Sequence, residues 1–535
     1  MKRWNGWGNV SIDYPLPESA QEYLVKKIGR LTPGPDADYD IVLGSAPGSR
    51  LPSHPMVESS AKDRLAHARG QSTRDWVALR TGRIQVFPDG VGYPRCAEDV
   101  RTLIGYAQKV GAKIIPYGGG TSVTGHINPM KSDQPVLTLS LEHMNQLVDL
   151  DEVGLTAIFE AGVTGPELEQ VLQARGYTLG HYPQSHEYST LGGWIATRSS
   201  GQQSYRYGRI EQLFAGGQVE TPRGSIVMPH FPASAAGPDI REMMLGSEGR
   251  LGVITSARVR IRRLPEAEEF HGIFFPSWEQ GAKAVRQICQ EEVPVSMLRL
   301  SNPQETETTL VLSGKAWIRT ADKGLRLIGY GDQRCLLVFG VTGNTAHVRL
   351  ARAQVISICR RQGGLFVGES VGRTWKKARF YSPYLRNTLW EQGVAIDTVE
   401  TAIPWAHVME ASAAIPASIV ESAHQSGEQV LAFAHLSHVY RDGASIYTTF
   451  LFRRLADPDG LLALWEGMKR AASQTIQRYG GTITHQHGVG LDHAPYLPSE
   501  KGALGMDMLR ALCRSLDPDE MMNPGKLIQD STRSV

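Results

Sequence analysis

The stretch that decides the fold is Pro116-Tyr117-Gly118-Gly119-Gly120-Thr121-Ser122. Its three consecutive glycines follow a short apolar run and let backbone N–H groups turn toward a ligand without interference from Cβ atoms. Two hydroxyl groups follow, so the loop suits a pyrophosphate. It is not a Walker A loop, because no lysine follows at the required spacing, and Val123 occupies the third glycine position of GxGxxG. Glycine clusters also form tight turns, so the loop alone leaves both interpretations open.

The segments around this loop alternate between helical and strand patterns. Ala97–Val110 has apolar residues on one helical face, and Gly111 ends the helix as a C′ glycine does. The expected elements that follow are strands at Lys113–Pro116, Val136–Leu141 and Thr156–Ala161 and a helix at Pro166–Arg175. The alternation continues to about Arg263, which is typical of an α+β or α/β nucleotide-binding domain.

Length and composition predict more than one domain. A chain of 535 residues is too long for a single ordinary core. Residues 1–80, rich in proline, glycine and charge, are expected to form an irregular arm with a helical patch near Ala20–Ile28. Leu264-Pro265, followed by an acidic run, marks a boundary, after which a second α+β domain is expected.

Charge and cysteine usage exclude several classes of protein. With 41% hydrophobic and 21% charged residues the chain is globular, and its net charge of only +2 argues against a nucleic-acid partner. Five scattered cysteines without CxxC spacing fit free thiols in a reducing compartment. The first residues lack the apolar core of a signal peptide, no stretch is long enough to span a bilayer, and the last residues carry no targeting tripeptide. We expect a cytoplasmic protein, and peripheral membrane contact stays open.

Three later segments favour a ligand longer than one phosphate. They are Pro183–Gly193, Thr197–Gly201 and Gly246–Ile254, and all are rich in small, hydroxyl-bearing residues or glycine. A dinucleotide needs such segments, because backbone must approach it closely along its length.

A second constellation lies near the C-terminus, in Thr482–His487. This run is predicted to be a short strand, in which His485 and His487 share one face while Gln486 points away. Two imidazoles on one face could transfer protons near neutral pH. Two alternatives remain: a metal site that adds His493, with His435 or His438, and histidines with a purely structural role.

The sequence resembles the FAD-linked alkyldihydroxyacetonephosphate synthase family, within the vanillyl-alcohol-oxidase-like (PCMH-type) flavoproteins. The resemblance runs almost from end to end. The motifs that carry it are WNGWG (4–8), PYGGGTSVTG (116–125), EAGVTGPELE (160–169), STLGGWIATRSSG (189–201), TPRG (221–224), GPDI (237–240), GSEGRLGVIT (246–255), HGVG (487–490) and LDPDEMMNPGK (516–526).

This resemblance implies the fold and the cofactor. The expected fold class is α+β, with a PCMH-type FAD-binding domain of two α/β subdomains at 81–263. A cap or substrate domain with an antiparallel sheet would follow at 264–479, and 480–535 would return to the flavin. The residues implied to bind FAD are Pro116, Tyr117, Gly118, Gly119, Gly120, Thr121, Ser122, Gln184, Ser185, His186, Glu187, Tyr188, Ser189, Thr190, Thr197, Arg198, Ser199, Ser200, Glu248, Gly249, Arg250, Leu251, Gly252, Val253 and Ile254. Thr121 stands where several covalent relatives carry a histidine, which implies non-covalent FAD.

The resemblance also implies catalytic and substrate-binding residues. Tyr447 matches the family's catalytic tyrosine, Arg386 the arginine that contacts substrate phosphate, and Arg299 an arginine near the active site. Without the resemblance these would be an aromatic strand residue, a solvated helix cation and an arginine at a strand edge. The family carries three consecutive histidines where this chain has His485-Gln486-His487, and glutamine cannot exchange a proton at physiological pH. Glu400–Trp405 matches a further family segment.

The function implied is replacement of the acyl group of acyl-dihydroxyacetone phosphate by a fatty alcohol, through an adduct at flavin N5 and without net electron transfer. The alternative is an FAD-dependent dehydrogenase or oxidase of a 2-hydroxy acid or polyol, in which Arg386 would bind carboxylate and His487 would take the hydroxyl proton. A catalytically degenerate flavin-binding partner subunit is a third hypothesis. We expect a small-molecule substrate with phosphate or carboxylate and a fatty chain, no metal, no nucleic acid, and a homodimer.

Overall fold

The glycine loop leaves the end of a small sheet that is parallel except for one edge strand. In the computed structural model, which describes residues 1–312 and 317–529, β3 (Lys113–Tyr117) pairs with β4 (Val136–Ser140), β4 with β2 (Gly90–Gly92), and β1 (Val57–Glu58) closes the edge. The predicted helix is confirmed as α5 (Ala97–Val110), and Gly111 ends it with φ 68°. The local patterns around the loop therefore predicted α5, β3 and β4 to within a residue, whereas β1 and β2 were not predicted.

A second, antiparallel sheet completes this half of the molecule. Its strand order is β5 (Leu147–Asp151), β6 (Thr156–Glu160), β10 (Val253–Arg260), β8 (Phe214–Thr221) and β9 (Gly224–Met228). The short strands β7 (Tyr177–Thr178) and β11 (Arg262–Arg263) pair beside it, and the helices are α6 (Gly165–Gln173), α7 (Leu191–Thr197), α8 (Ser204–Tyr207), α9 (Ile210–Leu213) and α10 (Ile240–Met244). One hydrophobic core joins α5, the strands of both sheets and the C-terminal helix.

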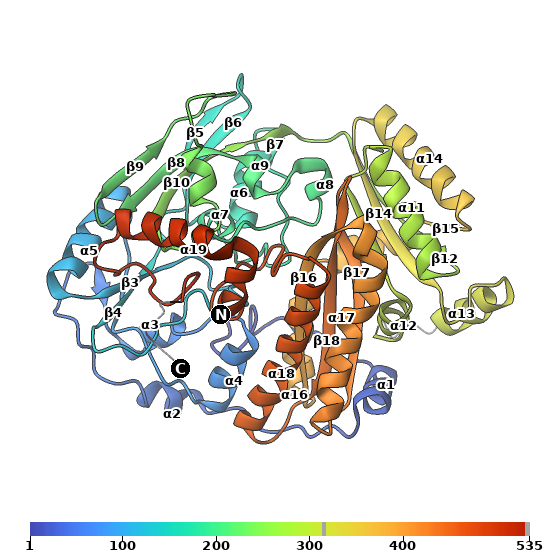
Figure 1. The fold of residues 1–535 in the computed structure, drawn as a ribbon, viewed down its shortest axis with the longest axis horizontal. Coiled ribbons are helices and arrows are strands. Elements are labelled where there is room, and N and C mark those ends of the chain that lie inside the picture. Colours follow the sequence, from blue (N-terminus) through green and yellow to red (C-terminus); the bar gives the residue numbers. More distant parts are fainter. Residues whose placement is uncertain (313–316, 530–535) are drawn as a thin grey trace.

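The other half is built on a seven-stranded antiparallel sheet. Its order is β15 (Leu365–Gly368), β12 (Ala267–Phe275), β14 (Cys335–Gly343), β13 (Met297–Ser301), β17 (Val430–Val439), β18 (Gly443–Arg453) and β16 (Val394–Pro404). One face packs against α11 (Trp278–Gln290), α14 (Thr345–Arg361), α17 (Trp405–Gln425) and α18 (Pro458–Arg478), as Figure 1 shows. The remaining helices are α12 (Pro303–Leu312), α13 (Trp317–Leu327), α15 (Glu369–Ala378) and α16 (Ser382–Glu391). The predicted boundary at Leu264 lies between β11 and β12.

The side chains of the seven-stranded sheet alternate between a face covered by helices and a face that lines a cavity. On β17, Ala434 and Leu436 belong to the core under the helices, whereas Phe433, His435 and Ser437 line a cavity. Successive side chains of a strand point to opposite faces, so one sheet both builds the core and presents a functional wall.

The N-terminal region contains more regular structure than the expected irregular arm. It forms α1 (Glu18–Ile28), α2 (Tyr39–Gly44), α3 (Ala61–Ala66) and α4 (Thr73–Thr81). Helix α1 packs on the sheet of the second half beside Leu431 and Leu451, while α2 to α4 share a small apolar cluster around Val42 and Leu79. Each of these helices is short and packs against apolar residues from other segments of the chain. A short helix shows few repeats of the apolar spacing, which explains why this spacing predicted only the helical patch of α1.

The C-terminal segment returns to the first half of the molecule. After the 3-10 turn η1 (Ala494–Tyr496), α19 (Leu497–Leu516) crosses the front of that half in Figure 1. The N–H of Asn523 then donates to the carbonyl of Ile114 at 2.7 Å, which fixes the chain end beside β3. In the described part of the chain no helix combines the length and apolar character needed to cross a bilayer.

Candidate functional site

A cavity of about 1110 Å³ lies between the glycine-rich loops and the free face of the seven-stranded sheet. The predicted cofactor residues that line it are Pro116, Tyr117, Gly118, Gly119, Gly120, Thr121, Ser122, Gln184, Ser185, Ser189, Thr190, Thr197, Ser199, Ser200, Glu248, Gly249, Gly252 and Ile254. From the sheet side and the C-terminal segment come Arg299, Tyr447, Gln486 and His487, with Arg386 from α16. Segments far apart in the sequence therefore meet around one space.

The glycine loop has the geometry of an anion cradle. The backbone N–H groups of Gly119, Gly120, Thr121 and Ser122 have no hydrogen-bond acceptor within residues 1–312 and 317–529, and all four residues line the cavity. Glycine is required at 119, because a Cβ there would lie 1.6 Å from the carbonyl oxygen of Tyr188. Consecutive free amides beside hydroxyl groups fit the diphosphate of FAD.

Seven of the predicted cofactor residues do not line the cavity and have structural contacts instead. They are His186, Glu187, Tyr188, Arg198, Arg250, Leu251 and Val253. Glu187 accepts a hydrogen bond from the Tyr384 hydroxyl at 2.9 Å, and Arg250 donates to the carbonyl of Met522 at 2.9 Å. These side chains tie the loops to α16 and to the chain end.

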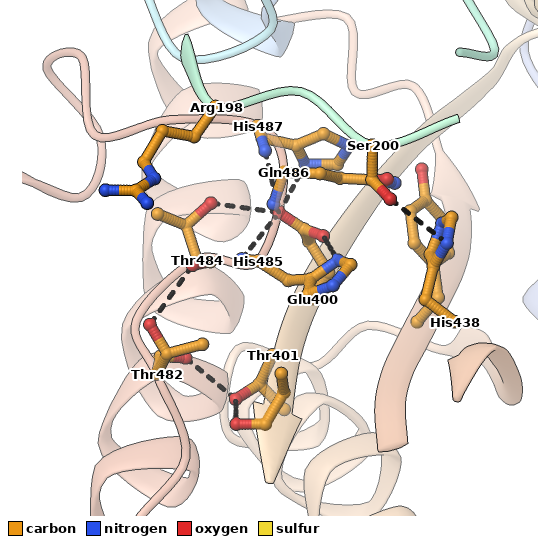
Figure 2. A network of polar contacts seen from close by, with 12 residues as sticks. Arg198, Ser200, Glu400, Thr401, His438, Thr482, Thr484, His485, Gln486 and His487 are labelled. Atoms are coloured by element: carbon orange, nitrogen blue, oxygen red, sulfur yellow. Dashed lines mark hydrogen bonds and ion pairs between the residues drawn. The ribbon is translucent and has the colours of Figure 1, made fainter. Parts of the chain in front are cut away.

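The C-terminal motif is not the predicted strand, because a distant carboxylate organises its backbone. Figure 2 shows Glu400, on β16, facing the loop Thr484–His487. Its Oε1 accepts the N–H groups of His485 at 3.0 Å, Gln486 at 2.8 Å and His487 at 2.9 Å, together with the Thr484 hydroxyl at 2.9 Å. Three successive N–H groups that converge on one oxygen form a nest, and this requires a bent rather than an extended chain.

This bend separates the two histidines that were expected to share a face. Gln486 and His487 line the cavity, whereas His485 turns away from it. The Nε2 atom of His485 lies 2.5 Å from Nη1 of Arg209 and 2.5 Å from the Tyr440 hydroxyl. A guanidinium can only donate, so Nε2 holds the lone pair and the ring proton sits on Nδ1, which faces Glu400 Oε2 at 3.6 Å.

Glu400 is ionised in this setting. Burial by itself raises the pKa of a carboxyl, but His487, His485 and the backbone donors hold the pKa of Glu400 well below its usual range. Burial also lowers the pKa of His485 and of His487, so the loop presents neutral imidazoles around one buried negative charge.

The turn that follows the histidines is anchored to the cofactor loops. Glu248 accepts the N–H groups of Val489 and Gly490, the latter at 2.8 Å, and its carboxylate lies 3.1 Å from Nε2 of His126. The His126 ring in turn contacts the Ser122 hydroxyl at 2.6 Å. Glu248 was predicted from the resemblance as a cofactor residue, and the structure adds this contact to the C-terminal turn.

Two arginines occupy different electrostatic settings. Arg386 stacks on Trp76 at 4.3 Å and donates to the carbonyl of Gln71 at 2.5 Å, with no ion-pair partner in the described part of the chain. Burial lowers the pKa of Arg386 to about 10, so it stays a cation at neutral pH. Arg299 instead pairs with Glu305 at 2.7 Å. Arg386 is therefore the better-placed cation for a ligand anion.

Tyr447 stands on β18 between two imidazoles. His435, its cross-strand neighbour, stacks on it at 5.0 Å and 19°, and His487 meets it edge-on at 5.7 Å. The Tyr447 hydroxyl donates to Thr398 at 3.2 Å, and burial raises the pKa of the phenol. The sequence predicted His435 only as a candidate metal ligand, and it did not predict a role for Glu305. The contacts of these two residues connect α12 and β13 with β17 and β18, two pairs of elements that are far apart in the sequence.

Within residues 1–312 and 317–529 the predicted histidines do not assemble as metal ligands. In the described part of the chain only Glu269, His271 and Glu369 bring ligand atoms within 4.8 Å of one another. Arg352 already pairs with Glu269 at 2.8 Å. In the same part of the chain, His485, His487 and His493 form no such group.

Comparisons with known proteins identify the family of the chain and its cofactor. Sequence models of an FAD binding domain and of the C-terminal domain of FAD linked oxidases match residues 88–228 and 264–527. Alkyldihydroxyacetonephosphate synthases of Dictyostelium discoideum and Trypanosoma brucei brucei are each 30% identical, over 98% of this chain and 93% and 92% of theirs. The glycolate oxidase subunit GlcD of Bacillus subtilis is 26% identical over 89% of the chain and 98% of its own length.

Solved structures give the same result. A structure of alkyldihydroxyacetonephosphate synthase superposes with a TM-score of 0.84 at 26% identity, covering 98% of both chains. The p-cresol methylhydroxylase structure, at a TM-score of 0.67 and 13% identity, covers 98% of this chain and shares the fold alone. The predicted fold class and the predicted cofactor, FAD, are confirmed.

Substitution of Gly119 by alanine should abolish FAD retention, because its Cβ would collide with the backbone of Tyr188. Flavin absorbance of the purified protein measures the effect. The control is Gly105→Ala in α5, where an added Cβ meets nothing within 4 Å and helix propensity favours alanine by roughly 1 kcal/mol. Full FAD retention in Gly119→Ala would contradict the assignment of the cradle.

Substitution Glu400→Gln should lower the free energy of unfolding by about 1.5–3 kcal/mol at pH 7, since hydrogen bonds to a charged acceptor are lost. The pKa of Glu400 is depressed in the folded state, so its contribution is present above the unfolded pKa of about 4.3 and is lost as pH falls through the folded pKa. Urea titrations at pH 7 and at successively lower pH should show the difference from wild type shrinking on acidification. An exposed control, Glu410→Gln on α17, should show neither effect, and a pH-independent difference would argue against an ionised Glu400.

Proposed function

The chain belongs to the alkyldihydroxyacetonephosphate synthase family, and we propose that it replaces the acyl group of acyl-dihydroxyacetone phosphate by a fatty alcohol, with FAD as cofactor. The observation that carries this proposal is the polarity of the cavity. One end offers Arg386, which has no ion-pair partner in the described part of the chain, together with Tyr447 and His487, and the other end is apolar.

The polar end suits a phosphate. Arg386 is half-buried, charged and without an ion-pair partner in the described part of the chain, and its position is fixed by Trp76 and Gln71. A planar guanidinium matches two oxygens of a phosphate at once. The substrate phosphate would therefore serve as the counter-ion of Arg386.

The apolar end suits a hydrocarbon chain. The cavity face of the sheet becomes less polar from one row of paired residues to the next. His435 pairs with Tyr447 in the first row and Phe433 with Thr449 in the second. In the third row Leu451 pairs with Ile396, and both side chains are apolar. Further apolar residues line the cavity, and they are Leu310, Leu312, Leu336, Val338, Leu385 and Leu389. Burial of a chain here gains about 0.8 kcal/mol for each methylene group.

The exchange needs proton transfer and exclusion of water but no net oxidation. The bound FAD supplies electrophilic and nucleophilic chemistry at its isoalloxazine ring. Tyr447 and His487 lie at the cavity wall where a substrate proton could be taken or returned, and His485 holds Glu400 and the loop in place behind them. Gln486 supplies hydrogen bonds only.

Several finer expectations belong to the same proposal. Thr121 at the cradle supports FAD held without a covalent bond, and an apolar substrate supports peripheral contact with a membrane that delivers it. We also propose a homodimer in the cytoplasm. The division into segments 1–80, 81–263, 264–479 and 480–535 is retained as a proposal.

The exchange assay decides between the synthase and the dehydrogenase. Wild-type enzyme with acyl-dihydroxyacetone phosphate and labelled fatty alcohol should form the ether without reducing a dye. The variant Gln486→His restores the residue of the relatives and should keep or raise this activity. Flavin bleaching and dye reduction by D-lactate, glycolate or glycerol phosphate, with no exchange by either protein, would replace the synthase proposal with the dehydrogenase.

Removal of the Arg386 charge should weaken phosphate binding. Arg386→Met keeps the apolar stem and should lower kcat/KM for the phosphorylated substrate by about 10- to 100-fold, mainly through KM, because a charge-assisted contact is lost. The dephosphorylated substrate should be used equally by wild type and variant. Arg349→Met, on the exposed side of α14, is the control. An equal loss on both substrates would show that Arg386 does not bind the phosphate.

A further inference from the structure

His435 forms a carboxylate–imidazole pair inside the cavity. Its Nδ1 atom lies 3.0 Å from Oε1 of Glu305, a buried residue of α12. Arg299 donates to the same oxygen at 2.7 Å. Burial by itself raises the pKa of a carboxyl, but Arg299 and His435 bring the pKa of Glu305 down to about 2, so the pair contains a carboxylate at neutral pH.

The hydrogen-bond pattern determines where the ring proton sits. Arg299 Nη2 also lies 3.2 Å from His435 Nδ1, but a guanidinium and a protonated Nδ1 can both donate to Glu305. The opposite tautomer would place the Nδ1 lone pair against a carboxylate oxygen at 3.0 Å with no proton between them. Nδ1 therefore carries the proton, and Nε2 carries the lone pair.

The lone pair of Nε2 is available to a ligand. His435 lines the cavity, and within residues 1–312 and 317–529 its Nε2 atom has no hydrogen-bond partner. His485 differs, because Arg209 occupies its Nε2, and Gln486 has no basic nitrogen. His435 thus combines an orienting carboxylate on one side with an open basic atom on the other, as general bases do.

His435 also stands where the polar and apolar ends of the cavity meet. Phe433 precedes it by two residues on the same face of β17, and Leu336 lies opposite Ser301, which pairs with His435 in the sheet. On its other side the ring stacks on Tyr447. The hydroxyl group at the head of a fatty chain held in the apolar end would lie at this boundary.

We propose that His435 is a further catalytic base of the exchange, positioned by Glu305, and that its Nε2 takes the hydroxyl proton of the incoming fatty alcohol. The inference rests on the proposed function. The alcohol oxygen bonds to the substrate carbon, the bond from that carbon to the acyl oxygen breaks, and the fatty acid leaves as a carboxylate. The proton then returns from Nε2 to solvent, so atoms and charge balance without an oxidant or reductant.

The base must be neutral to act, and its surroundings favour that form. The titratable and charged groups that face His435 are Glu305 on α12, Arg299 on β13, Tyr447 on β18 and His438 on its own strand. Burial and Arg299 lower the pKa of His435, whereas Glu305 raises it. Loss of the Glu305 charge should therefore move the acidic limb of the rate profile to lower pH.

The experiment compares His435→Ala, Glu305→Gln and the control His407→Asn, an exposed histidine on α17. Each variant is first checked for bound FAD by its absorbance. His435→Ala should lose about 100-fold or more in kcat with a smaller change in KM, and added imidazole should restore part of the loss. Glu305→Gln should lower kcat and shift the acidic limb of its pH profile downward, and His407→Asn should match wild type.

Three results separate the possible failures. Exchange by wild type with a His435→Ala kcat within about 2-fold of it would overturn the role of His435 alone. A Glu305→Gln enzyme with a lower kcat but an unchanged acidic limb in its pH profile would also overturn the role of His435. A carboxylate with a purely structural role would give that result. Absence of exchange by wild-type, FAD-loaded protein would instead overturn the proposed function.

Discussion

The buried carboxylate of Glu400 is the contact on which the arrangement of the site depends. It lies on β16 of the seven-stranded sheet and collects three consecutive N–H groups from a loop more than eighty residues later in the chain. A fully buried anion is costly unless donors surround it, so the loop cannot leave this position without exposing an unpaired charge. This one requirement brings Gln486 and His487 to the cavity and keeps His485 behind it.

A second carboxylate, that of Glu248, holds the same C-terminal segment from the other half of the molecule. Glu248, in the glycine-rich turn after α10, binds the N–H groups of Val489 and Gly490. Glu400 and Glu248 therefore hold the two ends of one short segment, one from each half of the molecule. The cofactor loops and the substrate-facing sheet are joined at the point where chemistry would occur, which agrees with the need to keep reacting groups fixed in position.

Histidines of this site differ in function because their neighbours differ. His485 points Nε2 at a guanidinium and is closed to ligands, whereas His435 points Nδ1 at a carboxylate and leaves Nε2 open. Both rings are buried, and burial lowers the pKa of both. The two histidines therefore differ in whether the lone pair of Nε2 is occupied. In His485 it faces Arg209, which suits a positioning residue, and in His435 it is open to the cavity, as the proposed base requires.

The sequence by itself determined the features that depend on neighbouring residues. The helix Ala97–Val110, its stop at Gly111 and the strand leading into the glycine loop were predicted correctly, because periodicity and glycine geometry act over a few residues. Motifs gave the family and FAD. The tertiary structure alone decided that Thr482–His487 is bent, that Arg386 faces the cavity without a counter-ion in the described part of the chain, and that Glu305 orients His435. Each of these depends on a charge or donor that comes from a distant segment, and no local pattern encodes which distant group will arrive.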